Sequence, residues 1–167
     1  MKKKFAILCL GILLFFLLLT TSSNASAAEL QTQSPISKTT TQLENGDSII
    51  IELNIPVNKN NAVSTCATTK NTSGSKSVKY RNSKGNILWS FTLSASFSYN
   101  GSSATCTSVS TSKKINDTAW KLSNITKSKS SNVAKGSVTA KECFLGIPFN
   151  TVTENLQLKC SANGTLS

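Results

Sequence analysis

The sequence predicts an all-β fold: an antiparallel β-sandwich, immunoglobulin-like or similar, with roughly six to eight strands. An open β-barrel is the alternative. Three observations support this prediction. Several segments alternate strictly between apolar and polar residues, turn-forming glycines recur at short intervals, and no segment keeps a helical period between caps.

The clearest predicted strand is Ile87–Tyr99. One parity of this segment is apolar or aromatic, and the other is serine and threonine apart from Leu88. Such alternation is typical of a strand that has one face on a core and the other in water.

The pair Asn100-Gly101 follows this strand directly and favours a tight hairpin, because both residues tolerate a positive φ. Pairing across that turn places Phe97 opposite Ala104. It also places Ala95 opposite Cys106, so that Cys106 is expected to point inward.

A similar turn, Lys84-Gly85-Asn86, precedes the long strand. In the segment before it, Val78 and Tyr80 are expected to face inward, whereas Lys79 and Arg81 are expected to face solvent. Gly146-Ile147-Pro148 is a further predicted turn. The other predicted strands are Ser48–Val57, Ala119–Thr126, Asn132–Leu145 and Thr151–Cys160.

The N-terminus has the order of parts of a secretory signal peptide. Three lysines precede the apolar run Phe5–Leu19, and the small residues of Ala25-Ser26-Ala27 predict cleavage between Ala27 and Ala28. The run is shorter than the roughly 20 residues of a membrane-spanning helix. Cys9 lies within the run rather than at its end, which argues against a lipoprotein anchor. We therefore expect a secreted, extracellular protein with no transmembrane segment after cleavage.

Three regions follow from this interpretation. Residues 1–27 are the signal peptide, residues 28–42 are a flexible polar leader or a loosely held first strand, and residues 43–167 are a single β domain. Cleavage leaves 15 basic and 7 acidic residues, a net charge of +8. This charge favours an anionic cell-envelope polymer as partner, although it also serves solubility alone, and another extracellular protein stays possible. Export argues against nucleic acid.

Four cysteines remain after cleavage, and no histidine is present anywhere. Their wide spacing does not fit a zinc site, whereas an even count in an exported chain predicts two disulfide bonds. Inward parity favours Cys106 with Cys160, which leaves Cys66 with Cys143. The sequence permits all three connectivities.

The residues that would carry catalysis are largely missing. The absence of histidine removes the commonest general base, and no nucleophile elbow or phosphate-binding glycine loop is present. Glu142 and Glu154 flank the Gly146 turn and are the one carboxylate pair worth testing, although acids beside a turn usually face water. We expect no enzymatic activity, no cofactor and no metal site.

A basic cluster is the remaining candidate site. Lys76, Lys79, Arg81 and Lys84 lie close together in the sequence, around Tyr80. They fit an anion-binding face, and they equally fit a solvated strand edge that discourages aggregation.

The sequence thus predicts a secreted, non-catalytic β-sandwich that serves as a surface or envelope binding or structural module favouring anionic partners. The alternative is a secreted antagonist: a pore-forming or bacteriocin-like toxin, or an inhibitor. Ile87–Val109 is the hairpin that would insert into a membrane, but its large aromatic residues favour a core position. In its lysine-rich signal peptide and Ser/Thr-rich strands the chain resembles small secreted proteins of Gram-positive bacteria.

Overall fold

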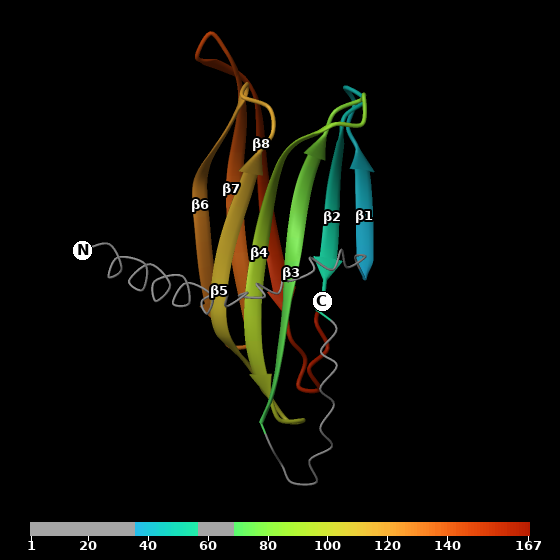
Figure 1. Ribbon diagram of the computed structural model, residues 1–167. Coiled ribbons are helices and arrows are strands. Elements are labelled where there is room, and N and C mark those ends of the chain that lie inside the picture. Colours follow the sequence, from blue (N-terminus) through green and yellow to red (C-terminus); the bar gives the residue numbers. More distant parts are fainter. Residues whose placement is uncertain (1–35, 57–68) are drawn as a thin grey trace, which may run out of the picture. The chain divides into compact units, whose positions relative to one another are not determined.

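The computed structural model describes residues 36–56 and 69–167, which form antiparallel strands in two sheets packed on each other (Figure 1). The first sheet contains β1 (Ser37–Gln42), β2 (Ser48–Asn54), β3 (Lys70–Arg81), β4 (Ile87–Tyr99) and β5 (Ala104–Ile115). The second contains β6 (Trp120–Ser130), β7 (Val133–Phe144) and β8 (Ile147–Lys159). The predicted β-sandwich is confirmed.

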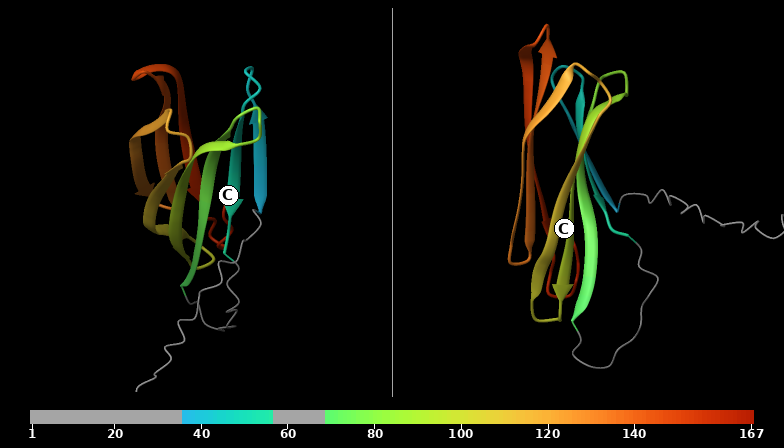
Figure 2. Two further views of the ribbon diagram at one scale, coloured as in Figure 1. Left: turned by 45° about the horizontal axis from the view of Figure 1, so that its top comes forward. Right: turned by 60° about the vertical axis from the view of Figure 1, so that its left-hand side comes forward.

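Each sheet follows the order of the chain, so that every strand pairs with its sequence neighbour. This meander differs from the Greek-key order of an immunoglobulin domain. The β1–β2, β3–β4, β5–β6 and β7–β8 connections therefore lie at one end of the sandwich, and the β4–β5 and β6–β7 turns lie at the other (Figures 1 and 2). Within the described ranges, no helix is long and apolar enough to cross a membrane.

The core combines large side chains from β4 with small ones from β7. Trp89, Phe91, Leu93 and Phe97 are completely buried, as the alternation in their strand predicts. On the facing strand, a Cβ added at Gly136 would lie 3.2 Å from Leu93 Cδ1 and 3.4 Å from Phe91 Cζ. Gly136 therefore allows the two sheets to approach closely at this point.

Three aromatic rings fill the core nearer the β7–β8 turn. Tyr80 and Trp120 have ring centroids 4.8 Å apart, and Trp89 lies 5.8 Å from Tyr80 and 6.0 Å from Trp120. Within the described part of the chain, neither buried indole N–H has a hydrogen-bond acceptor. The rings thus join the two sheets through apolar and ring–ring contacts, which at such distances add to the effect of burial.

The β4–β5 turn corrects the expected register. It contains four residues, Asn100–Ser103, and the Asn100 side-chain oxygen accepts hydrogen bonds from two amides within it. Phe97 therefore pairs with Cys106, and Ala95 pairs with Val109 beyond a bulge. The expected partner was wrong by two residues at Phe97 and, because of the bulge, by three at Ala95. The shift of two at Phe97 keeps the parity, so Cys106 still points inward and is 4% exposed.

Of the two interpretations of residues 28–42, a leader or a loosely held first strand, the structure has a strand at Ser37–Gln42: β1 pairs with β2 although all six of its residues are exposed. At the other end of the chain, the predicted turn Gly146-Ile147-Pro148 is instead Leu145-Gly146, with β8 beginning at Ile147. Pro148 is tolerated because β8 is an edge strand.

We expect Gly136→Val to lower the free energy of unfolding by about 1–3 kcal/mol, because the added methyl groups would push against Phe91 and Leu93. Urea denaturation of the purified protein measures the loss. Lys135→Val is the matched control, since Lys135 is exposed on the opposite face of the same strand. Equal stability of the two variants would contradict the close approach of the sheets.

Candidate functional site

The end of the β7–β8 hairpin carries the largest exposed apolar side chains of the described residues. Phe144, Leu145, Ile147 and Phe149 are 70%, 88%, 70% and 65% exposed, and we call these four residues the apolar tip. The hairpin extends beyond the other turns at its end of the sandwich (Figures 1 and 2). Exposed apolar groups gathered in one place mark a surface that contacts a partner or a membrane.

The backbone of the apolar tip is unfavourable for its sequence. Leu145 and Gly146 form a two-residue turn with φ values of 50° and 84°. Such turns favour Asn-Gly, because a bulky side chain is disfavoured at positive φ. Leu145 is thus a costly residue for this turn as well as an exposed one, and backbone strain of this kind tends to occur at functional positions.

Three side chains of the apolar tip lie together. Phe144 is directly opposite Ile147, and Phe149 follows at the next position of the same parity. With Phe149 they line a hollow of about 430 Å³ that is bounded by apolar side chains alone. These three side chains of the apolar tip therefore present a continuous apolar surface.

Two lysines lie just below the apolar tip. Lys121 on β6 is directly opposite Lys141 on β7, and both are exposed. We call them the lysine pair. Like charges in direct opposition destabilise a sheet. Within residues 36–56 and 69–167, the salt bridges all involve Glu52 on the other sheet, so no carboxylate is bridged to the lysine pair.

A polar network holds the base of the hairpin on the first sheet. The Tyr80 hydroxyl donates to Asp47 Oδ2 over 2.7 Å and also interacts with Asn150 on β8. Asn150 in turn donates to Glu142 Oε2 over 3.3 Å. Burial raises the pKa of Tyr80, a hydrogen bond from Asn45 opposes the rise, and Asp47 adds to it. The hydroxyl therefore stays protonated and can donate to Asp47, which links this part of the first sheet to β8 below the apolar tip.

The predicted basic cluster does not form one patch. Lys79 and Arg81 point outward, whereas Lys76 pairs with Leu53 and Leu93 and so lies on the inner face. Lys79 Nζ forms a salt bridge with Glu52 Oε2 at 2.5 Å. Lys84 lies in the exposed β3–β4 turn. The outward charges are thus partly neutralised, and the four residues are divided among three places.

The two carboxylates considered for catalysis lie well apart. Glu142 is opposite Asn150, and Glu154 is opposite Val138, four positions further along β7. Four strand residues span roughly 13 Å, more than the separation used by glycosidases. Burial raises the pKa of Glu154. Within the described ranges, no three metal-ligating side chains lie together.

The cysteines lie at both ends of the sandwich. Cys106 and Cys160 are buried near the β6–β7 turn, whereas Cys143 is partly exposed beside the apolar tip. All three are free thiols in the structure, so the expected Cys106–Cys160 bond is not formed there. Cys66 lies outside the described residues, and its pairing with Cys143 stays a prediction. The predicted signal peptide and the predicted cleavage site between Ala27 and Ala28 also lie outside them.

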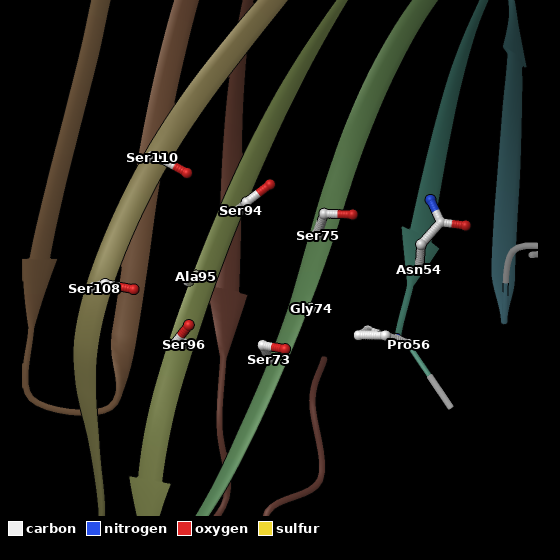
Figure 3. A pocket seen from close by; sticks show the side chains of 10 residues that line it. All are labelled: Asn54, Pro56, Ser73, Gly74, Ser75, Ser94, Ala95, Ser96, Ser108 and Ser110. Carbon is white, nitrogen blue, oxygen red and sulfur yellow. The ribbon is translucent and has the colours of Figure 1, made fainter. Parts of the chain in front are cut away.

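The outer face of the first sheet is rich in serine hydroxyls, as the alternation of β4 predicts (Figure 3). A shallow groove of about 370 Å³ crosses β3, β4 and β5 on this face. Its lining residues are Asn54, Pro56, Ser73, Gly74, Ser75, Ser94, Ala95, Ser96, Ser108 and Ser110. The groove contains neither a charged nor an aromatic side chain, so it lacks the groups that usually orient a ligand.

Sequence reasoning missed the apolar tip because it interpreted Gly146 and Pro148 as marks of an ordinary turn. The available signal was four large apolar residues within Phe144–Phe149, where a solvent-exposed turn favours polar ones. Comparison with protein-family models, with curated proteins and with solved structures gave no match to this chain. The site is therefore defined by its geometry alone.

We expect Leu145→Asn to raise the free energy of unfolding by about 1 kcal/mol, because asparagine adopts a positive φ more readily. Urea denaturation measures the gain. Leu145→Ala is the control: it removes the apolar side chain but keeps a residue that disfavours the turn. A gain of the same size in both variants would show that backbone strain at Leu145 is not the cause.

Glu154→Gln should stabilise the protein at neutral pH. The raised pKa of Glu154 means that its ionised form is less favourable in the folded than in the unfolded state, so wild-type stability falls as the pH rises through the window between the two values. At a pH below the pKa of Glu154 in the unfolded state, the carboxyl is protonated in both the folded and the unfolded protein. The advantage of glutamine should therefore vanish there. Denaturation curves at neutral and acidic pH test this, and an advantage that is independent of pH would contradict it.

Proposed function

We propose that this is a secreted, non-catalytic binding protein that attaches to a lipid bilayer containing anionic phospholipids. The observation that carries the proposal is the apolar tip: four large, highly exposed side chains at the end of a projecting hairpin. This proposal retains the surface module expected from the sequence and names the anionic partner. Because export leads to an oxidising compartment, disulfide bonds remain part of it.

The energies favour the apolar tip as the main contact. Full burial of one large apolar side chain stabilises by roughly 1.5–3 kcal/mol, and the tip offers four that are mostly exposed in water. A basic residue near an anionic membrane contributes about 1 kcal/mol. The apolar term is therefore expected to set the affinity, whereas the lysine pair sets the preference for anionic lipid.

The lysine pair complements such a surface in position as well as in sign. Lys141 lies three residues before Phe144, so the charges would lie at headgroup depth when the apolar tip enters the acyl region. An anionic headgroup near both ammonium groups would relieve the repulsion between Lys121 and Lys141.

Shallow attachment fits the structure better than the pore-forming alternative. The hairpin that would insert under that alternative contains Trp89, Phe91 and Phe97, which are fully buried between the sheets. Exposing them to lipid would dismantle the core of the sandwich. The apolar tip needs no such rearrangement, because its side chains are already exposed.

Vesicle sedimentation tests the proposal. The secreted protein should bind vesicles of mixed phosphatidylcholine and phosphatidylglycerol, and Phe144→Ser with Phe149→Ser should weaken binding at least about tenfold. Ile125→Ser is the matched control, because Ile125 is an exposed apolar residue outside the tip. Absence of binding by the wild-type protein would rule out the proposal. If the double variant binds as tightly as the wild-type protein, the contact with lipid lies on another surface and its assignment to the apolar tip is wrong.

The lysine pair gives a second, separable result. Lys121→Gln with Lys141→Gln should weaken binding to the anionic vesicles roughly tenfold, with little effect on vesicles of phosphatidylcholine alone. Lys79→Gln with Arg81→Gln is the control of equal charge. A larger loss in this control would identify the outer face of the first sheet as the anionic contact. Sedimentation without lipid shows whether the apolar tip instead joins two copies of the chain, which would overturn the lipid assignment.

A further inference from the structure

Two buried cysteines from different sheets converge on one turn. Cys106 lies on β5, and Cys160 directly follows β8. The Cys106 N–H donates to the Ser131 carbonyl over 2.7 Å, and the Cys160 N–H donates to the Asn132 carbonyl over 3.0 Å. Since Ser131 and Asn132 are consecutive residues, the two cysteine nitrogens lie within roughly 10 Å of each other.

The turn between them is fixed. Ser131 has a φ of 50°, and the Asn132 side chain donates to the Cys160 carbonyl over 2.6 Å. The Lys129 ammonium donates to the Thr107 carbonyl on β5. These contacts hold the ends of both sheets at the same turn and limit the separation of the two cysteines.

Both side chains also enter the same core. Cys106 is 4% exposed and Cys160 is fully buried, and both belong to the one cluster of buried apolar residues. Burial raises the pKa of the Cys160 thiol, and the negative charge of a Cys106 thiolate raises it further. In the structure each thiol donates only to a nearby carbonyl, that of Ser108 or Ser161, at 3.3 Å.

We propose that Cys106 and Cys160 form an oxidation site whose product is a disulfide bond between the two sheets. One thiolate attacks the disulfide of an oxidant such as oxidised glutathione or a thiol–disulfide oxidoreductase, giving a mixed disulfide and one released thiolate. The second cysteine then displaces the other half. An Sγ–Sγ bond forms, the oxidant takes up two electrons, and the two cysteine protons pass to its thiolates.

The bond would restrain the fold at the end opposite the apolar tip. The sheets are two separate hydrogen-bonded ladders, so packing contributes most of the contact between them. A covalent link also reduces the freedom of the unfolded chain over the long loop from Cys106 to Cys160. Burial raises the pKa of both thiols, although Lys129 lowers that of Cys106, so few thiolates exist in the closed sandwich. We therefore expect the bond to form during folding rather than after it.

Peptide mapping tests the pairing. The protein is refolded with oxidised glutathione, its free thiols are alkylated, and it is digested without reductant. We expect one cross-linked product that contains Cys106 and Cys160 and is two hydrogens lighter than the separate peptides. Recovery of both cysteines alkylated, or of either one joined to Cys66 or Cys143, would refute the proposal.

Thermal unfolding tests the restraint. The measurements are made in a Cys66→Ala with Cys143→Ala background, because the predicted Cys66–Cys143 bond would otherwise contribute to Tm and would also be broken by reduction. In this background, reduction and the further substitution Cys160→Ala should each lower Tm by about 10 °C relative to the oxidised protein. Ser110→Ala in the same background is the control and should retain the oxidised Tm, because Ser110 is an exposed residue of β5 outside the proposed bond. An unchanged Tm after reduction would overturn the restraint. This proposal does not rest on lipid binding, since the apolar tip variants should keep the disulfide.

Discussion

The close approach of β4 and β7 at Gly136 is the contact on which the rest of the structure depends. Phe91 and Leu93 occupy the space that a side chain at this position would fill. The separation of the sheets at this point is therefore set by large side chains of β4 that pack on a small residue of β7. In both strands, inward-facing residues alternate with outward-facing ones. β7 begins after the Ser131–Asn132 turn, to which Cys106 and Cys160 donate, and it leads into the hairpin that carries the apolar tip. The same contact therefore positions both ends of the sandwich.

The two ends of the sandwich differ in how well their side chains are packed. At the end where Cys106 and Cys160 lie, the C-terminal residues fold back, and Leu166 pairs with Cys160 in an isolated β-bridge. Gly164 lies so close to Tyr99 that an added Cβ would be 2.4 Å from its ring. At the other end, the apolar tip leaves four large side chains in water and a leucine at positive φ. Strain and exposure are therefore concentrated where a partner could relieve them, while the closed end contributes stability.

Parity was the part of the fold that the sequence predicted well. Alternation correctly placed Trp89, Phe97 and Cys106 inward, because neighbouring residues of a strand must face opposite sides. Register was not predictable from Asn100-Gly101, since the asparagine caps a four-residue turn instead of forming a two-residue one. The sequence could not decide between a leader and a loosely held strand at β1, because both faces of β1 are exposed and its residues do not alternate between apolar and polar.

The candidate sites show the same limit. Lys76 and Lys79 are close in sequence, but their odd spacing puts them on opposite faces, and Glu52, which pairs with Lys79, comes from another strand. The apolar tip had the opposite problem: its apolar content was visible, but turn-forming residues dominated the interpretation of the segment. In both cases the decisive property was exposure, which depends on the neighbouring strands.

Electrostatic attraction acts over a longer distance than apolar contact, and this difference decides how the two would act together. The net charge of +8 expected after cleavage would attract the protein to anionic surfaces over about a Debye length, roughly 10 Å at moderate salt, but the charge is spread over both sheets and does not define an orientation. The apolar tip acts only on contact. In the proposed attachment to a membrane, long-range attraction would therefore raise the frequency of encounters, and the short-range contact would select the orientation in which the β7–β8 hairpin meets the membrane. The lysine pair is the place where both effects would act on the same lipids.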